Sequence, residues 1–223
     1  AMLRERLRER FVLPLCRAIV VTSERMRQAW CSRYPGIENR IHVIPNYVDE
    51  SVFRPLPGTR GDRAAGSLDL IFTGRLADQK NLDLLIEAVR RCPDTRLRLI
   101  GLGPEEDRLR QLAQSCEGRV SFLGTVENHL LAEHYADADV FVLTSHYEGN
   151  PKALLEAMAC GTPVIGTAVQ GIADAIDDGT TGLLVEPSVD ALVAAIGRMR
   201  DPALRQTLGR NAREKVLAQN GLQ

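Results

Sequence analysis

The sequence has few aromatic residues, almost no net charge, no closely spaced cysteines and no long apolar run. Aromatic residues make up 4% of the 223 residues and the formal net charge is −1, which argues against a base-stacking or basic surface for nucleic acid. The five cysteines are widely spaced and form no C-x-x-C pair. We therefore expect reduced, mostly packing thiols and no disulfide framework.

Membrane-spanning and secretory signals are also missing from the pattern. No apolar run approaches the ~20 residues that a membrane span needs, and the opening AMLRERLRERF is too charged for the apolar part of a signal peptide. We therefore expect a cytoplasmic protein. Leu3, Leu7 and Phe11 share one helical stripe among arginines. This stripe suits packing on a neighbouring element, with peripheral contact at a membrane surface as the alternative.

Short apolar runs rich in β-branched residues alternate with helical patterns along the chain. The runs are continuous rather than alternating, which is typical of parallel strands buried on both faces. The sequence therefore predicts an α/β fold with a doubly wound parallel sheet, whose ligands bind at the carboxyl ends of the strands. The predicted strands cover 18–21, 41–44, 68–74, 97–101, 120–124, 139–144, 163–166 and 182–185, and the predicted helices cover 24–33, 81–91, 104–116, 127–135, 151–160, 188–199 and 201–218.

One segment interrupts this alternation. Residues 54–67, RPLPGTRGDRAAGS, are rich in Pro, Gly, Arg and Asp and have no apolar period, so they are predicted to be a linker. The preceding block, residues 1–53, contains only two strands, too few for an independent open sheet. We expect this block to be a remnant of a larger N-terminal domain and residues 68–223 to form the main domain.

The first candidate site follows the strand that ends at Gly74. Arg75 and Lys80 lie in the turn before the helix that starts near Asn81. Two cations beside the exposed N–H groups and positive dipole of a helix N-terminus suit a diphosphate. The alternative is two solvated loop cations, with Lys80 offset by Asp78.

The second candidate site is the segment SHYEGNPKALLEAMACG, residues 145–161, which carries two acids. Glu148 lies in the loop after a buried strand, and Glu156 lies more than one turn into the next helix. Asn150 is predicted to be the N-cap and Pro151 the first helical residue, and Gly149 lets the backbone approach a ligand. Two carboxylates there can accept hydrogen bonds from sugar or ribose hydroxyls. The alternatives are an ordinary loop acid at 148 and a solvated helix acid at 156.

Other motifs carry weaker signals. Glycines in 166–185 permit tight turns near a ligand, and plain turn chemistry explains them equally well. GLGP at 101–104 has G-x-G without a third glycine, so it is a weak dinucleotide signal. His129 and His134 are five positions apart, a poor match for one helical face, and we expect no metal site.

Five segments in order resemble the retaining glycosyltransferases with the GT-B fold, specifically family 4 (glycosyl transferases group 1). The most specific match is the E-x7-E signature, here Glu148 to Glu156, and the resemblance covers residues 17 to 218. It implies the Rossmann-like C-terminal half of a GT-B fold, which binds the nucleotide-sugar donor. The five segments are TGRLADQKNLDLLIEA, GLGPEEDRLRQLA, VSFLGTV, ADVFVLTSHYEGNPKALLEAMACGTPVI and DGTTGLLV.

The resemblance implies a role for each candidate residue. Arg75 and Lys80 would bind the donor diphosphate and stabilise the leaving nucleoside diphosphate. Glu148 would contact the donor sugar, and Glu156 would accept hydrogen bonds from the ribose hydroxyls. The family needs no metal, because cations and a helix terminus neutralise the leaving group. Further donor contacts are implied at Gly74, at the backbone of Gly149, Asn150 and Pro151 near the sugar hydroxyls and phosphate, and at the backbone of Thr125 and Val126 near the base.

Two positions depart from the family's pattern. Residues 46–49 read Asn-Tyr-Val-Asp where the family usually has Asn-Gly-Val-Asp. Tyr47 replaces the glycine, so the turn is expected to differ. Gln170 stands where a second glycine is common, which bears on the loop on the sugar side.

The resemblance implies transfer of a sugar from a UDP- or GDP-linked donor to a glycan or lipid-linked acceptor. In this family the N-terminal domain supplies the acceptor site, and most of that domain is expected to be missing here. The chain alone is therefore expected to bind nucleotide and to transfer sugar poorly, because a closed cleft must align the substrates and exclude water. Two alternatives remain open. One is a nucleotide-sugar epimerase, which the E-x7-E spacing does not support, and the other is a nonenzymatic nucleotide-binding or assembly module.

Overall fold

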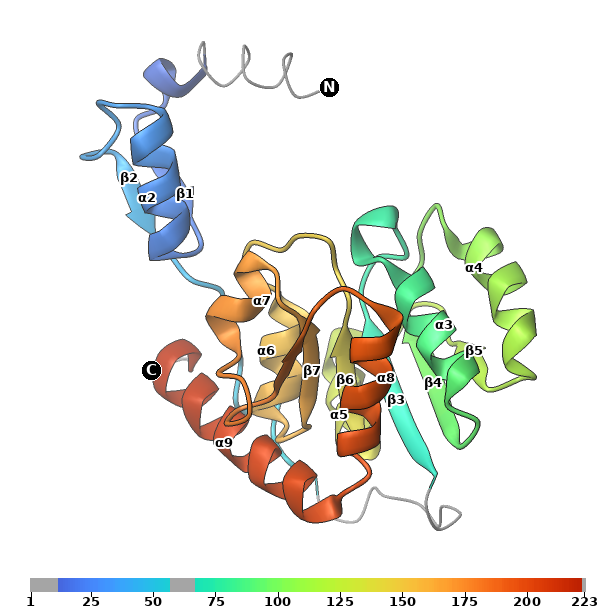
Figure 1. The fold of residues 1–223 in the computed structure, drawn as a ribbon. Helices are drawn as coiled ribbons and strands as arrows, with labels where there is room; N and C mark the ends of the chain where they lie inside the picture. Colours follow the sequence, from blue (N-terminus) through green and yellow to red (C-terminus); the bar gives the residue numbers. More distant parts are fainter. Residues whose placement is uncertain (1–11, 57–66, 222–223) are drawn as a thin grey trace. The chain divides into compact units, whose positions relative to one another are not determined.

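The computed structural model describes residues 12–56 and 67–221 (Figure 1). The chain divides into two compact units, Ala1–Asn46 and Tyr47–Gln223, which are described separately below. The predicted stripe of Leu3, Leu7 and Phe11 lies outside the described residues, as does most of the predicted linker.

The first unit is a small α/β element. Strands β1 (Ile19–Val21) and β2 (Ile41–Val43) pair in parallel, and α2 (Glu24–Arg33) connects them after the 3₁₀ turn η1 (Leu13–Leu15). The Ser23 hydroxyl accepts a hydrogen bond from the backbone N–H of Met26 at 3.1 Å, which caps the N-terminus of α2. Both strands and the helix are confirmed where the sequence predicted them.

The second unit contains a parallel sheet of six strands. Its order is β5-β4-β3-β6-β7-β8, so the strand order reverses between β3 and β6. This confirms the predicted doubly wound sheet, and the fully buried side chains of β6 fit a strand covered on both faces. The strands are β3 (Leu68–Thr73), β4 (Thr95–Ile100), β5 (Val120–Phe122), β6 (Val140–Leu143), β7 (Val164–Thr167) and β8 (Leu183–Val185).

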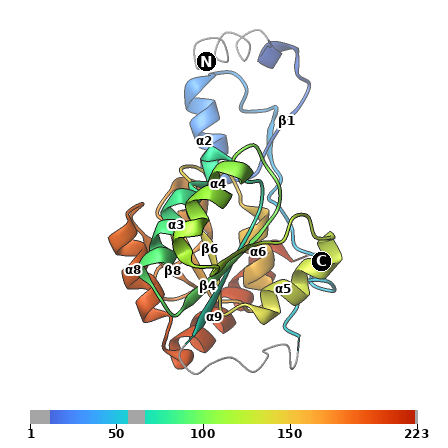
Figure 2. The ribbon, with the colours of Figure 1, turned by 90° about the vertical axis from the view of Figure 1, so that its right-hand side faces the viewer.

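Helices cover both faces of this sheet. Helix α3 packs beside α4 and α8 on one face, and α6 packs beside α5 and α9 on the other (Figure 2). The helices are α3 (Leu82–Arg91), α4 (Glu106–Ala113), α5 (Leu131–Asp137), α6 (Lys152–Ala159), α7 (Gln170–Ala175), α8 (Val189–Arg198) and α9 (Pro202–Asn220), with 3₁₀ turns η2 (Asp78–Lys80), η3 (Gln114–Cys116) and η4 (Asn128–Leu130).

The division between the units differs from the predicted boundaries at residues 53 and 67. Val48 is 0% exposed and Phe53 is 2% exposed, and both belong to the core of the second unit. Val48 forms a parallel bridge with Gly221, and the Phe53 ring lies 6.2 Å from the ring of Tyr135. Amino-acid composition identifies the hydrophilic linker segment, but it does not show how the residues before the linker pack. Residues 47–53 therefore belong with the sheet that follows them.

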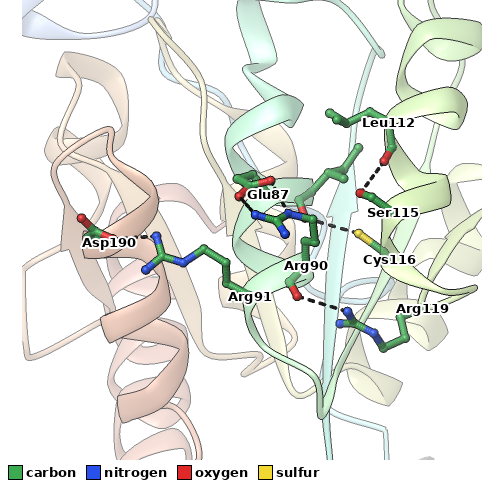
Figure 3. Close-up of polar contacts among 9 residues, drawn as sticks. Glu87, Arg90, Arg91, Leu112, Ser115, Cys116, Arg119 and Asp190 are labelled. Carbon is green, nitrogen blue, oxygen red and sulfur yellow. Dashed lines mark hydrogen bonds and ion pairs between the residues drawn. The ribbon is translucent and has the colours of Figure 1, made fainter.

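The C-terminal end of α3 is held by side chains from neighbouring elements (Figure 3). The Arg119 guanidinium donates hydrogen bonds to the carbonyl oxygens of Cys92 at 2.9 Å and Arg90 at 3.3 Å. A cation at a helix C-terminus satisfies free carbonyl groups and complements the helix dipole. Arg91 pairs with Asp190 of α8 at 2.6 Å, which links the two neighbouring helices at the surface. These contacts hold α3 in place, and its N-terminus follows the loop that carries the candidate cations.

Helices α6 and α9 approach closely where two glycines meet. A Cβ atom added to Gly209 of α9 would lie 2.2 Å from the carbonyl oxygen of Gly161, just after α6. In α8, by contrast, a Cβ atom added to Gly197 meets nothing within 4 Å.

We predict that Gly209→Ala and Gly197→Ala change stability in opposite directions. Alanine favours helix by about 1 kcal/mol over glycine, so Gly197→Ala should stabilise the fold by up to that amount. Gly209→Ala should instead destabilise it by about 1–3 kcal/mol, because the new methyl group meets backbone rather than a movable side chain. Urea denaturation measures both. Stabilisation by Gly209→Ala would contradict the close approach of α6 and α9.

Candidate functional site

A cavity of about 320 Å³ opens at the carboxyl ends of β3, β4 and β5, facing the start of α6. It lies at the edge of the sheet where the fold predicts ligands to bind. Four of the predicted donor-contacting residues line it: Gly74, Thr125, Val126 and Glu156. The other lining residues are Thr73, Ile100, Gly101, Asn128, Leu131, Lys152 and Ala153.

The loops after β3 and β4 lie backbone against backbone beside this cavity. A Cβ atom on Gly101 would lie 1.9 Å from the Gly74 carbonyl oxygen, and one on Gly103 would lie 2.1 Å from the Leu76 carbonyl oxygen. Gly101 also has a φ of +133°, which L side chains rarely adopt. The GLGP segment, whose sequence was only a weak dinucleotide signal, thus shapes the cavity by allowing two loops to meet.

Glu156 is buried in the wall of the cavity, with 3% of its surface exposed. The interpretation of Glu156 as a solvated helix acid is therefore wrong. Burial raises the pKa of its carboxyl group, while Lys152, Asn128 and Tyr135 favour the ionised form. Lys152 Nζ lies 3.6 Å from Glu156 Oε1. Among the described residues Oε1 has no hydrogen-bond partner, so its capacity to accept hydrogen bonds is not filled by them.

An ion pair joins the two loops that flank the reversal of strand order. Lys80 Nζ lies 2.6 Å from Glu148 Oε1, and the Ser145 hydroxyl donates a hydrogen bond to the same oxygen at 2.6 Å. The Lys80 side chain also lies close to Gly74 in the cavity wall: a Cβ atom added to Gly74 would lie 3.8 Å from Lys80 Cε. The ammonium group is thus held beside the cavity, and its remaining hydrogens can reach a second anion.

The loop between β6 and α6 rests against the start of α7. A Cβ atom on Gly171 would lie 2.5 Å from the carbonyl oxygens of both Glu148 and Gly149, so only glycine fits there. The predicted N-cap at Asn150 is wrong by one residue, because Pro151 is the N-cap and α6 begins at Lys152. The extended ψ of 100° at Pro151, whose carbonyl oxygen accepts the first helical bonds, explains the difference.

Arg75 lies apart from these contacts. It is exposed, and its guanidinium has no hydrogen-bond or ion-pair partner among the described residues. Its diphosphate role therefore stays a prediction. Lys80 differs, because its partner is Glu148 and not Asp78, the partner in the alternative interpretation.

Several residues around the site had no assigned role from the sequence. Lys152 precedes Glu156 by four positions, a helical spacing that could have indicated the pair. Asn128, Ser145, Tyr135 and Gly171 gave no comparable signal, because their positions depend on how loops and helices from distant parts of the chain pack together.

Within residues 12–56 and 67–221, no group of three or more His, Cys, Asp or Glu residues could hold a metal ion. No described helix is both long enough and apolar enough to cross a membrane.

Residues 61–215 match the family model of glycosyl transferases group 1. The chain belongs to this family. It is 36% identical over 200 residues to a D-inositol 3-phosphate glycosyltransferase from Acidothermus cellulolyticus, covering 80% of this chain and 44% of the relative. The chain thus spans about half the length of the curated relatives it matches.

Solved structures of similar fold include the sucrose-phosphate synthase of Thermosynechococcus elongatus, with a TM-score of 0.83 and 34% identity over 92% of this chain and 54% of that one. Another is Anabaena Alr3699/HepE in complex with UDP and glucose, with a TM-score of 0.82 and 23% identity over 95% of this chain and 62% of that one. These likenesses fit the C-terminal Rossmann-like half of a GT-B fold.

We predict that Glu156→Gln stabilises the protein near neutral pH. Burial raises the pKa of Glu156 above its value in the unfolded chain. Between the pKa of the unfolded chain and the higher pKa of the folded protein, the unfolded state has already lost its proton while the folded state keeps it. Stability therefore falls as the pH rises until the folded state ionises too. Glutamine carries no charge and removes this cost, which is about 1–3 kcal/mol on the scale of a buried polar atom without a hydrogen-bond partner.

Urea denaturation at pH 7 and at about pH 4, near the ordinary carboxyl pKa, checks this prediction. The gain should be present at pH 7 and shrink toward zero at the lower pH. Glu214→Gln, at an exposed position on α9, is the matched control and should change little at either pH. An equal effect of Glu156→Gln at both pH values would contradict the buried charge.

Proposed function

We propose that this chain is the donor-binding half of a retaining glycosyltransferase. In this proposal it binds a UDP- or GDP-linked sugar, and the sugar is transferred to a glycan or lipid-linked acceptor. The observation that carries the proposal is the buried Glu156 carboxylate, which lines a cavity at the carboxyl ends of the strands and whose Oε1 has no hydrogen-bond partner among the described residues. Family membership and the bound UDP of the Anabaena structure support it.

The nucleoside is proposed to occupy the cavity. Vicinal ribose hydroxyls would donate hydrogen bonds to Glu156 Oε1, and the base would lie against the backbone at Thr125 and Val126 in the cavity wall. Hydrogen bonds to a charged acceptor are stronger than neutral ones. This combination would give affinity through the ribose and select the base by backbone geometry.

The diphosphate is proposed to lie beside the N-terminus of α3. Lys80 would contact a phosphate oxygen while it keeps its bond to Glu148, and Arg75 would add a second cation from the surface. Two cations and helix N–H groups neutralise the charge that develops on a leaving nucleoside diphosphate, so the proposed reaction needs no metal. Glu148 would contact the donor sugar from the loop that Gly149 allows to approach closely.

The acceptor side of the reaction is proposed to require the other half of a GT-B enzyme. Reaction needs both substrates aligned in a cleft that excludes water. We therefore expect these 223 residues alone to bind nucleotide and to transfer sugar poorly. The proposed setting is cytoplasmic, with peripheral membrane contact as an option for a lipid-linked acceptor.

We predict that the chain binds at least one of UDP, GDP and ADP, and that Glu156→Ala weakens this binding about 10- to 100-fold by removing a charged acceptor. Isothermal titration calorimetry with the three nucleotides measures this and identifies the base. Glu214→Ala is the control and should leave the affinity unchanged. If the Glu156 variant binds with unaltered affinity, Glu156 does not contact the ribose. If no nucleotide binds, a nonenzymatic assembly module is favoured.

We also predict that Arg75→Gln weakens binding of the nucleoside diphosphate on the order of tenfold, the scale of one charge-assisted hydrogen bond. Binding of the nucleoside without phosphates should stay unchanged, because the lost contact is to phosphate. Arg210→Gln, at an exposed position on α9, makes the same charge change away from the cavity. Equal effects of the two variants would show a general charge effect and remove Arg75 from the site.

A further inference from the structure

A buried tyrosine lies behind the carboxylate that faces the cavity. Tyr135 of α5 is 0% exposed and does not line the cavity. Its hydroxyl donates a hydrogen bond to Glu156 Oε2 at 3.4 Å and lies 2.6 Å from Thr73 Oγ1 at the end of β3. Three elements far apart in the sequence, β3, α5 and α6, therefore meet in one polar chain inside an apolar core.

The direction of this chain follows from the chemistry of its members. An ionised carboxylate can only accept hydrogen bonds, and a tyrosine hydroxyl carries a single hydrogen. When Tyr135 donates to Glu156, Thr73 must donate to Tyr135. Burial raises the pKa of Tyr135 well above its ordinary value, so the phenol keeps its proton. Hydrogen bonds in such a chain strengthen one another.

The two oxygens of Glu156 have different surroundings. Oε2 is bonded to Tyr135 in the core. Oε1 has no hydrogen-bond partner among the described residues and lies 3.6 Å from Lys152 Nζ. A hydrogen bond to Oε2 restricts the rotation of the carboxylate and therefore the position of Oε1, in a side chain that lines the cavity. Pre-set geometry of this kind lowers the cost of ordering a group when a ligand binds.

We infer that Tyr135 is a positioning residue that fixes the Glu156 carboxylate, through Oε2, for recognition of the vicinal hydroxyls of a ribose by Oε1. This inference rests on the proposed nucleotide function of the cavity. It assigns the hydroxyl of Tyr135 a role in selecting ribose although that hydroxyl does not touch the ligand.

The surroundings of Glu156 also predict a pH signature. The groups that act on it are Tyr135 from α5, Asn128 from η4 and Lys152 from α6, which favour the carboxylate, while Cys160 lies close enough to interact with it from the end of α6. Removing the tyrosine hydroxyl leaves only Asn128 and Lys152 against the effect of burial. The carboxylate of such a variant should therefore take up a proton at a higher pH than in the parent protein.

The test compares Tyr135→Phe with the parent chain in titrations with UDP and with 2′,3′-dideoxy-UDP, each from pH 5 to pH 8. Tyr135→Phe should weaken UDP binding on the order of tenfold and leave binding of the dideoxy nucleotide unchanged. The loss of UDP affinity on acidification should begin at a higher pH in the variant. Tyr47→Phe, at an exposed hydroxyl, is the matched control and should change neither ligand.

Thr73→Val keeps Tyr135 and removes only the outer donor, so it should weaken UDP binding less than Tyr135→Phe and with the same dependence on the ribose hydroxyls. It replaces Tyr135→Phe if that variant does not fold. An equal loss of affinity for both nucleotides would assign Tyr135 a merely structural role and overturn the inference, as would no loss for either.

The same titrations separate the ribose role of Glu156 from the positioning role of Tyr135. If the parent chain does not distinguish UDP from its dideoxy analogue, the proposed ribose role of Glu156 fails and the inference fails with it. If the parent chain distinguishes them and Tyr135→Phe does so equally well, only the positioning role of Tyr135 is wrong.

Discussion

Strand β3 pairs in parallel with β6 in the middle of the sheet, and the chain leaves these two strands toward opposite faces, into α3 and α6. No helix can cover the edge where the two connections diverge, which is why ligands bind there in doubly wound folds. The loop after β3 carries Lys80 and the loop after β6 carries Glu148, and the 2.6 Å ion pair between them closes the gap. The parallel pairing of β3 with β6 therefore underlies the rest of the site: it sets the position of the cavity, of Glu156 and of the neighbouring loops.

The site contains a buried carboxylate with one oxygen that has no hydrogen-bond partner among the described residues. Burial of a carboxylate costs free energy unless its oxygens have partners. At Glu156 one oxygen is bonded to Tyr135 and the other is not hydrogen-bonded among the described residues. In the proposed function, a ribose supplies the missing hydrogen-bond donors. The buried carboxylate lowers the stability of the free protein, a loss of stability that is typical of functional sites.

The sequence predicted the sheet well because its strands are continuous apolar runs, such as VFVL at Val140–Leu143, whose side chains are all buried. It also placed Glu148 in the loop after this strand and Glu156 in the next helix, where the structure has them. It did not predict the boundary after Asn46, because the burial of Val48 and Phe53 depends on distant packing partners. Lys80 pairing with Glu148 rather than Asp78, and the contact of Tyr135 with Glu156, were equally invisible, since each joins positions that no local pattern relates.

We propose that the cavity between the strand ends and α6 holds the nucleoside of a sugar donor. A crystal structure of the 223-residue chain with bound UDP or GDP tests it most directly. We expect ribose hydroxyls within hydrogen-bond distance of Glu156 Oε1, the diphosphate near Lys80 and Arg75, and the Tyr135 hydrogen bond to Oε2 preserved. A nucleotide bound elsewhere, or one whose ribose points away from Glu156, would contradict it.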